Sequence, residues 1–346
     1  MKIDVSNRLM KTLDRLKRRG IILMYHRIVD QGFNPRQLSV SPKNFNEHMQ
    51  VIKKHGHPVS MGEMGKGLHR FSLGMQEIVI TFDDGYADNF YNAAPILKEH
   101  GIPATFFIIS GSIGSQEEFF WDDLEQVILA PQTLPKIFEA VINKKKYHWE
   151  IISQGPCQAI DYSKEINDDP QNTTHLVLSR SQLYLMLNQI LAPLKLEERK
   201  DALEQLAEWA GHALTTRSGN LPMGLGDLAS LSDCTLFEIG AHTVSHPRLS
   251  LLSLEKQEDE IARSKSDLEN ILNRPVNSFS YPYGNYSDET VRIVERLKFK
   301  NACTVVQQPV ARRQNPCLLP RFSVLDWNGD EFERNLENWL VKECHP

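Results

Sequence analysis

The chain has 346 residues, of which 41% are hydrophobic and 24% are charged. A chain of this size and composition can bury a large core, so it fits an enzyme built as one α/β domain with insertions or as two smaller domains. The net charge is -5, and the 39 basic residues are scattered along the sequence. Composition and charge therefore exclude a disordered chain and give no basis for nucleic-acid binding.

The first 20 residues show no apolar segment of the kind found in secretory signals, and no run of about 18 apolar residues follows. The five cysteines form no CxxC pair and are odd in number, which argues against a disulfide framework. We therefore expect a cytoplasmic protein that does not span a membrane. Residues 1–20 are expected to form an N-terminal helix, and its leucines and basic residues leave open a peripheral contact with an anionic membrane.

Apolar runs and helical patterns alternate in the first third of the sequence. The run IILMY at 21–25 predicts a buried strand that ends at His26. The segment 41–56 predicts a helix, because a Ser cap precedes a Pro at its start and a Gly closes it. A second strand begins at Ile78 and ends in acidic residues, and a helical pattern and a third apolar run follow. This alternation predicts parallel strands in an α/β fold.

Residues 112–222 interrupt the alternation. Helical patterns around 123–142 and 180–213 predict an inserted helical region or cap rather than further strands of the same sheet. The alternation resumes at FEIGAHTVSHP and continues to the end of the chain. We therefore expect an α/β barrel over residues 21–346 that is interrupted by an insertion at 112–222.

Polar side chains fall at the ends of successive predicted strands. In a parallel barrel the carboxyl ends of all strands lie on one face, where active sites are built. One face should therefore collect all of these side chains. They are His26, Asp83, Asp84, His242, His246, Tyr283, Arg321 and Asp326.

The spacing of His242 and His246 lets both imidazoles reach one metal ion if the chain turns between them. Alone, this spacing is a weak signal. A carboxylate strengthens it, because two histidines and one carboxylate leave open positions on a divalent ion, as in catalytic sites. The adjacent acids Asp83 and Asp84 suit this chemistry, since one can bind the metal while the other takes a proton from the activated water. The alternative for this acidic pair is a surface turn.

The motifs TFDDGYADN, HTVSHP and YPYG stand in the order and approximate spacing of the NodB-type polysaccharide deacetylases, carbohydrate esterase family 4. The chain resembles this family over residues 20–115 and 222–327, and the segment between them is not covered. The resemblance implies a distorted (β/α) barrel of the NodB type with an inserted helical region. It also implies a metal-dependent hydrolase that removes N-acetyl groups from amino sugars of a glycan or a glycan precursor.

The resemblance assigns roles to individual residues. Asp83 matches the general base of the family, and Asp84, His242 and His246 match its three metal ligands. The backbone N–H of Tyr283 matches the donor that the family directs at the oxyanion of the tetrahedral intermediate. The implied metal is a divalent ion, with zinc as the first choice and cobalt or nickel as alternatives.

Two positions depart from the pattern of the family. Many members have an arginine that orients the base where this chain has Ser280, and we propose Arg321 as its substitute, because a guanidinium can grip a carboxylate with two nitrogens. The alternative for Arg321 is a salt bridge at the rim of the barrel. The C-terminal Leu-x-x-His-Asp motif, which supplies the general acid, is missing, and His345 in the terminal segment is a poor substitute.

A branch that resembles the poly-N-acetylglucosamine deacetylases takes its general acid from an N-terminal YH motif. The segment ILMYHRI fits that motif, so His26 becomes the candidate acid, with a buried structural histidine as the alternative. Asp326 and Trp327 resemble the Asp-Trp motif of the family, which supports the active site, although Trp327 suits a core position equally well. The aromatic residues at 119–121 could stack on sugar rings, but packing is the more common role of such clusters.

The expected substrate is an N-acetylated saccharide. A lipid-linked or nucleotide-linked precursor fits a cytoplasmic enzyme better than a finished wall polymer, and a lipid-linked substrate would bring the protein to a membrane surface. Two alternatives remain at this point. The same site could hydrolyse a formyl group or a cyclic amide, or the chain could be a catalytically silent glycan-binding protein.

Overall fold

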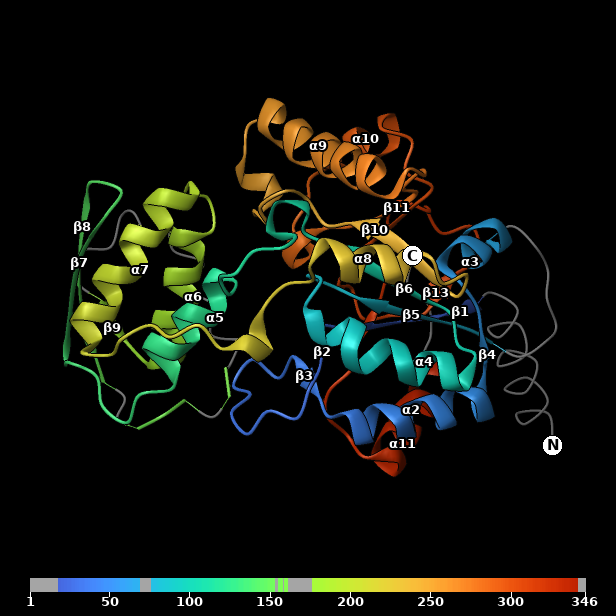
Figure 1. Ribbon diagram of the computed structural model, residues 1–346, viewed down its shortest axis with the longest axis horizontal. Coiled ribbons are helices and arrows are strands. Elements are labelled where there is room, and N and C mark those ends of the chain that lie inside the picture. The colour runs from blue at the N-terminus through green and yellow to red at the C-terminus, as the bar shows by residue number, and fades with distance from the viewer. Residues whose placement is uncertain (1–17, 69–75, 153–154, 158, 161–175, 342–346) are drawn as a thin grey trace, which may run out of the picture. The chain divides into compact units, whose positions relative to one another are not determined.

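The computed structural model describes residues 18–68, 76–152, 155–157, 159–160 and 176–341 (Figure 1). The chain folds into two compact units. The first, which we call the barrel unit, comprises residues 1–30, 38–114 and 222–346. The second, the insert unit, comprises residues 31–37 and 115–221. Among the helices of the described segments, none is both long enough and apolar enough to span a lipid bilayer.

A curled and mostly parallel sheet forms the centre of the barrel unit. Its strands lie in the spatial order β12, β11, β10, β6, β5, β1 and β13, with β4 beside β5 and β14 beside β1. The strands are β1 (Arg18–Tyr25), β4 (His57–Pro58), β5 (Glu77–Phe82), β6 (Ala104–Ile108), β10 (Phe237–Ala241), β11 (Ser278–Ser280), β12 (Asn301–Cys303), β13 (Val310–Ala311) and β14 (Phe322–Ser323). A small separate pair is formed by β2 (Arg27–Ile28) and β3 (Ser39–Val40).

A short C-terminal segment joins the two ends of the curled sheet. On one side, Leu319 forms a parallel bridge with Cys303 of β12. On the other side, Phe322 of β14 pairs in parallel with Leu23 of β1. The sheet therefore curls into a distorted barrel, which confirms the predicted fold class.

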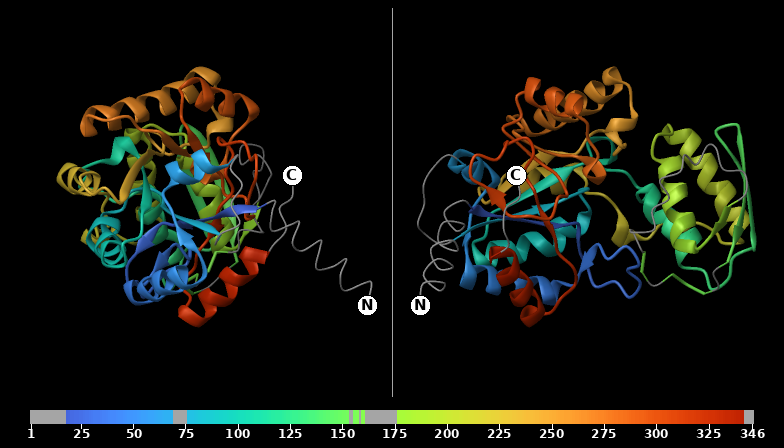
Figure 2. Two further views of the ribbon diagram at one scale, coloured as in Figure 1. Left: turned by 90° about the vertical axis from the view of Figure 1, so that its right-hand side faces the viewer. Right: turned by 180° about the vertical axis from the view of Figure 1, so that it is seen from behind.

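Helices surround the barrel on its outer side, as the end-on view in Figure 2 shows. Figure 1 shows α2, α4 and α11 together on one side of the sheet and α9 with α10 on the opposite side. Their apolar faces pack against one face of β5 and β6 in the main core. The other face of these strands, with Val79 and Phe107, packs in a second buried cluster with Met61 and Met64, as expected for parallel strands that are covered on both sides. The helices are α2 (Pro42–His55), α3 (Met61–Gly67), α4 (Ala94–His100), α8 (Leu225–Ser232), α9 (Leu254–Leu272), α10 (Asp288–Arg296) and α11 (Gly329–Val341), with short helical turns η1 (Asn89–Ala93), η2 (Ser110–Ser112), η6 (Leu249–Leu251) and η7 (Pro282–Gly284).

The local signals near the N-terminus explain most of the first elements. The side chain of Ser41 accepts a hydrogen bond from the backbone N–H of Asn44, and Gly56 caps the other end, so the predicted helix is confirmed as α2. The predicted first strand is also present, but β1 begins at Arg18. Residues 18–20 therefore form part of a strand and not the end of a helix, because they pair with β13 and β5. The rest of the predicted N-terminal helix, residues 1–17, lies outside the described residues.

The insert unit combines helices with a small sheet of its own. The strands β7, β8 and β9 form this sheet in that order, with β7 antiparallel to β8 and β9 parallel to β8. The elements are α5 (Phe120–Leu124), η3 (Glu125–Leu129), β7 (Ile137–Ile142), β8 (Lys145–Ile151), β9 (Leu176–Leu178), α6 (Arg180–Leu191), α7 (Leu196–Ala210) and η5 (Ser218–Asn220).

The predicted helix at 123–142 is therefore wrong beyond Leu129. Pro131 and Pro135 follow the helix and interrupt its pattern. Residues 137–142 then alternate between exposed and buried positions with a period of two, which suits a strand that is buried on one face. A two-residue loop completes the hairpin, and both of its residues have positive φ, as a type I′ turn requires.

The aromatic cluster of the insert unit is a packing cluster. Phe119, Phe120 and Trp121 are all buried. The rings of Phe119 and Trp121 stack with centroids 4.8 Å apart, and Phe120 meets Trp121 edge to face at 5.0 Å. These contacts are internal to the unit, so they provide the packing role that the sequence also allowed.

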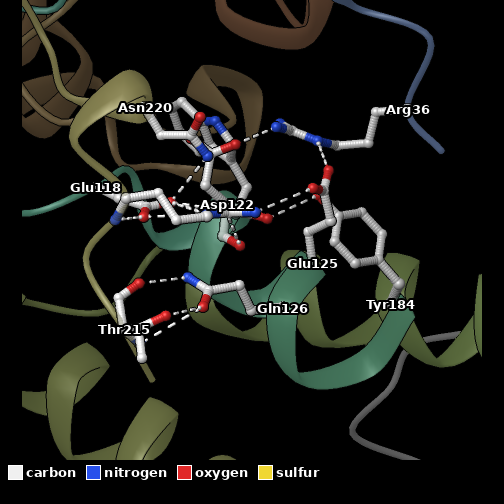
Figure 3. Close-up of polar contacts among 10 residues, drawn as sticks. Arg36, Glu118, Asp122, Glu125, Gln126, Tyr184, Thr215 and Asn220 are labelled. Atoms are coloured by element: carbon white, nitrogen blue, oxygen red, sulfur yellow. Dashed lines mark hydrogen bonds and ion pairs between the residues drawn. The ribbon is translucent and has the colours of Figure 1, made fainter. Parts of the chain in front are cut away.

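A buried network of ion pairs explains why residues 31–37 belong to the insert unit (Figure 3). The guanidinium of Arg36 donates from Nε to Glu125 Oε2 at 3.0 Å and also bonds Asp122. Arg217 Nη2 donates to Glu118 Oε2 at 2.6 Å. Since Asp122 and Glu125 are almost completely buried, Arg36 is needed to compensate their charge. A segment that lies between β2 and β3 in the sequence is thereby bound to the insert.

Candidate active site

The candidate residues come from the carboxyl ends of neighbouring parallel strands. His26 directly follows β1, Asp83 follows β5, His242 follows β10 and Tyr283 follows β11. The strands β1, β5, β6, β10 and β11 are adjacent in the sheet and run in parallel. Their carboxyl ends therefore lie at one end of the barrel, where enzymes of this architecture place their active sites.

Three of the predicted residues converge on one point. Asp84 Oδ1 lies 3.6 Å from His242 Nε2 and 3.5 Å from His246 Nε2. All three residues are buried. Two ligand atoms that each lie about 2.1 Å from a tetrahedral zinc ion are about 3.4 Å apart. The observed spacing therefore fits three ligands on one face of a divalent ion.

The second nitrogen of His242 fixes its protonation state. Nδ1 lies 2.8 Å from the backbone carbonyl of Ser280, which can only accept a hydrogen bond. Nδ1 must therefore carry the proton, and Nε2 presents its lone pair toward Asp84. Burial lowers the pKa of His242 although the charge of Asp83 and the carbonyl of Ser280 oppose this shift. The imidazole is thus kept neutral, as a metal ligand must be.

Unusual backbone conformations direct the three ligands toward one another. The φ angles of Asp84, Thr243 and His246 are 74°, 64° and 59°, in the left-handed region that residues with a side chain rarely adopt. The chain turns between the two histidines, and the Thr243 hydroxyl accepts a hydrogen bond of 3.0 Å from the His246 backbone N–H. Strained residues of this kind cluster at functional sites, where the surrounding structure holds them in place.

A bidentate ion pair holds the carboxylate beside the three ligands. Arg321 donates from Nη1 to Asp83 Oδ1 and from Nη2 to Asp83 Oδ2, both at 2.7 Å. Arg321 is 0% exposed, so it lies inside the barrel and not at its rim. Its Nη1 also bonds the Thr81 hydroxyl at 3.1 Å, and its Nε bonds the Thr304 carbonyl at 3.0 Å. These contacts fix the plane of the guanidinium and, through it, the orientation of Asp83.

The electrostatics of this pair keep Asp83 ionised. Burial alone would raise the pKa of the Asp83 carboxyl, but the charge and hydrogen bonds of Arg321 outweigh it, with smaller effects from His242 and His26. The pKa of Asp83 is therefore held well below its ordinary value. A carboxylate beside a candidate metal site is thus available as a proton acceptor at neutral pH.

Ser280 contributes more to the site than the sequence indicated. Its hydroxyl donates to Asp83 Oδ2 at 3.2 Å and accepts from Arg321 Nη2 at 2.9 Å. Its carbonyl is the acceptor for His242 Nδ1. Sequence comparison identified Ser280 only as the residue that replaces an arginine. The structure shows that it links the carboxylate, the guanidinium and one candidate ligand.

His26 is half-buried at the end of β1 and is close enough for its charge to lower the pKa of Asp83. Its backbone is tied to the segment that follows the acidic pair. Asn89 Nδ2 donates to the His26 carbonyl at 2.8 Å. Asp88 accepts hydrogen bonds from the Ile28 backbone N–H at 2.8 Å and from Arg27 Nε at 2.9 Å. Sequence analysis did not identify Asp88 or Asn89, although both lie in the quoted motif TFDDGYADN.

Tyr283 packs against one of the candidate metal ligands. Its ring centroid is 4.5 Å from that of His246, and the guanidinium of Arg248 lies over the Tyr283 ring at 4.6 Å. The φ angle of Tyr283 is 57°, which interrupts the helical turn η7. The aromatic ring thus packs against the imidazole of His246 at an interplanar angle of 57°.

The side chain of Asp326 reaches the N-terminal end of α2 and caps it. Its Oδ1 accepts hydrogen bonds from the Ser41 backbone N–H at 2.8 Å and from Asn44 Nδ2 at 2.7 Å. The next residue, Trp327, is partly buried near Trp339, and its carbonyl bonds the ring of His48. The structure therefore assigns both residues contacts that hold helices against the barrel. His345 lies outside the described residues.

Fold and site together define an α/β barrel with a buried Asp-His-His cluster beside an ion-paired carboxylate. The family model for polysaccharide deacetylase matches residues 72–147 and 227–302. The YxkH protein of Bacillus subtilis (strain 168) is 23% identical over 305 residues, which cover 88% of this chain and 70% of that protein. The chain is similar to the NodB-type polysaccharide deacetylases, and the resemblance predicted from the sequence is confirmed.

Solved structures share the fold. The Streptococcus pyogenes deacetylase PplD, determined in complex with acetate, aligns with a TM-score of 0.57 and 18% identity, covering 92% of this chain and 99% of that one. IcaB from Ammonifex degensii aligns with a TM-score of 0.55 and 16% identity, covering 94% of this chain and 98% of that one. At these identities, the alignments establish the fold and leave the substrate to be argued from the site.

Proposed function

We propose that this protein is a metal-dependent hydrolase that removes N-acetyl groups from amino sugars of a glycan or a glycan precursor. The convergence of Asp84, His242 and His246 beside the buried Asp83–Arg321 pair is the observation that supports this proposal. Two imidazoles and one carboxylate suit zinc, with cobalt and nickel as alternatives. Open positions on such an ion leave room for water and for the acetyl oxygen.

The residues divide the work of hydrolysis. A divalent ion bound here would polarise the acetyl carbonyl and lower the pKa of the attacking water. Asp83 accepts the proton of that water, and Arg321 keeps the carboxylate oriented while it does so. Oδ2 of Asp83 already accepts two hydrogen bonds, from Arg321 Nη2 and from the Ser280 hydroxyl. The proton therefore goes to Oδ1, which accepts from Arg321 Nη1 and has a second lone pair.

The low pKa of Asp83 also limits its power as a base, since a weakly basic carboxylate takes protons only from an acidic donor. This limit agrees with a site that must hold a metal to work. His26 then protonates the leaving amine, and the Tyr283 backbone N–H donates to the oxyanion of the tetrahedral intermediate. The products are acetate and a free amine.

The family resemblance implies an N-acetylated saccharide as the substrate, and the choice among such saccharides is our inference. We propose a lipid-linked or nucleotide-linked N-acetylated saccharide in the cytoplasm as the substrate. A lipid-linked substrate would bring the barrel unit to a membrane surface. Similar structures include a deacetylase in complex with acetate and a de-N-acetylase from Aggregatibacter actinomycetemcomitans, which supports removal of an N-acetyl group.

Acetate release from a panel of N-acetylated saccharides tests the proposal. The protein is first stripped with a chelator and then refilled with zinc, cobalt or nickel. We expect release to require metal and to fall by about 10²- to 10⁴-fold in Asp83→Asn, because the general base is lost. Asp259→Asn is the matched control, since this aspartate forms an exposed ion pair with Arg263 on α9.

The rival activities are arms of the same assay. Release of formate from N-formyl sugars, or opening of a cyclic amide, without acetate release would replace the deacetylase by a different hydrolase on the same site. A fully metal-loaded protein that binds saccharides and turns over none of these substrates would be a glycan-binding protein. Either result would overturn the proposed reaction.

A further inference from the structure

The loop that connects His242 and His246 is anchored by a carboxylate from a neighbouring helix. Glu260 of α9 accepts hydrogen bonds at Oε2 from the backbone N–H groups of Val244 and Ser245, both at 2.9 Å. Its Oε1 accepts a third hydrogen bond from the Ser245 hydroxyl at 2.7 Å. The Glu260 side chain thus binds two of the three residues between the histidines, Val244 and Ser245.

The opposite side of the same loop is fixed by the barrel. The backbone N–H of Ser110 donates to the Thr243 carbonyl at 3.1 Å, and that of Gly111 donates to the Val244 carbonyl at 3.0 Å. A Cβ atom at Gly111 would lie 2.5 Å from the Val244 carbonyl oxygen, so this close approach requires glycine. The loop is therefore clamped between the end of β6 and the helix α9.

The clamp holds a backbone that would otherwise relax. Thr243 and His246 both have left-handed φ angles, of 64° and 59°. Threonine is β-branched, and such residues strongly disfavour this region. A strained loop keeps its conformation only when its surroundings determine it, and here the conformation places the two imidazoles on the same side.

From these contacts we propose that Glu260 is a positioning residue for the metal ligands, which it holds in their binding geometry through the loop at 243–245. The inference rests on the proposed metal site and deepens it. Glu260 acts on the ligands through its hydrogen bonds to Val244 and Ser245, so its role is to position them and not to bind the metal. Groups that orient metal ligands in this way change metal affinity by about 10- to 100-fold when they are removed.

Zinc affinity of the metal-free full-length protein, measured by competition with a chromophoric chelator, tests the inference. We expect Glu260→Ala to weaken zinc binding by about 10- to 100-fold, and Glu260→Gln to weaken it less, since the amide keeps one acceptor oxygen. Glu258→Gln is the matched control, because Glu258 is on the same helix and pairs with Arg296. His242→Ala gives the reference for the loss of a ligand.

The structural part of the inference has its own readout, amide hydrogen exchange at Val244 and Ser245 in the metal-free protein. We expect faster exchange at these two amides in both Glu260 variants and unchanged exchange in the barrel strands. If Glu260→Gln and Glu260→Ala are folded and bind zinc as the wild type does, the positioning role is wrong while the metal site stands. If the folded wild type binds no zinc, the proposed function fails and the positioning role fails with it, whatever the exchange data show.

Discussion

Replacement of Arg321 by methionine tests whether the buried ion pair organises the site. Arg321 is completely buried and donates hydrogen bonds to four residues. The acceptors are both carboxylate oxygens of Asp83, the hydroxyls of Ser280 and Thr81, and the carbonyl of Thr304. Methionine fills part of the volume and leaves Asp83 buried without its partner. Breaking one side of a buried ion pair costs about 3–5 kcal/mol, so we expect a loss of that size in the free energy of unfolding.

The assay is urea unfolding of the metal-free protein at pH 7, with the double variant Asp83→Asn/Arg321→Met as the comparison. Removing both charges leaves no uncompensated charge, and such replacements of buried ion pairs are often close to neutral. We therefore expect the double variant to be more stable than Arg321→Met alone. With the single variant Asp83→Asn added, these proteins complete a double-mutant cycle that gives the coupling energy of the pair directly.

The pH dependence of the same variant gives a second test. In the wild type the folded pKa of Asp83 lies below the unfolded value of 3.8, so the pair stabilises the fold above that pH and the contribution is lost as the pH falls. Without Arg321, burial dominates and raises the folded pKa, so the variant gains stability as the pH falls through the new value. The difference between the two proteins should shrink toward pH 4. A loss below about 1 kcal/mol at pH 7, or a difference that is constant with pH, would refute the reasoning.

Three further predictions concern the insert, the metal and His26. Burial and the charges of Glu118 and Asp122 raise the pKa of Asp123 from 3.8 to about 7, so the fold should lose stability as the pH rises from about 4 to about 7. Asp123→Asn should remove this decline in thermal unfolding, and an unchanged slope over that range would contradict the assignment. Zinc at 100 times its dissociation constant should stabilise the stripped protein by about 2.7 kcal/mol, measured by calorimetry, whereas no shift would argue against a folded-state site. Asn89→Ala removes the hydrogen bond to the His26 carbonyl and should lower kcat by up to about 100-fold with unchanged zinc affinity; full activity would show that His26 needs no such support.

The candidate metal ligands could be predicted because their signals are local. Asp84 directly follows an apolar strand, and His242 and His246 are separated by a single turn of chain. Parallel strands then bring these two segments to one end of the barrel without any information about individual side chains. The sequence therefore predicts which residues meet, and the structure adds the left-handed conformations that aim them.

The contacts that support these residues could not be predicted in the same way. Arg36 and Asp122 are 86 positions apart, and Ser280 and Asp83 are 197 positions apart. A charged residue on a helix, such as Glu260, has the same sequence pattern whether its side chain anchors a loop or is exposed to solvent. The sheet of the insert was missed for a different reason, because a short apolar run fits a helix and a strand about equally until its proline boundaries and its hairpin turn are weighed.

The position of Arg321 connects closure of the barrel to assembly of the base. Leu319 and Phe322 join β12 to β1, and Arg321 lies between them, so the residues that close the sheet also deliver the guanidinium to Asp83. Ser280 is small enough to bond both groups at once. An arginine at position 280 would place a second guanidinium where Asp83 already pairs with the first, and two buried cations cannot share one carboxylate without an uncompensated charge. The serine that precedes the YPYG segment and the arginine in the closing segment are therefore best understood as one arrangement, in which the base is oriented only when the barrel is closed.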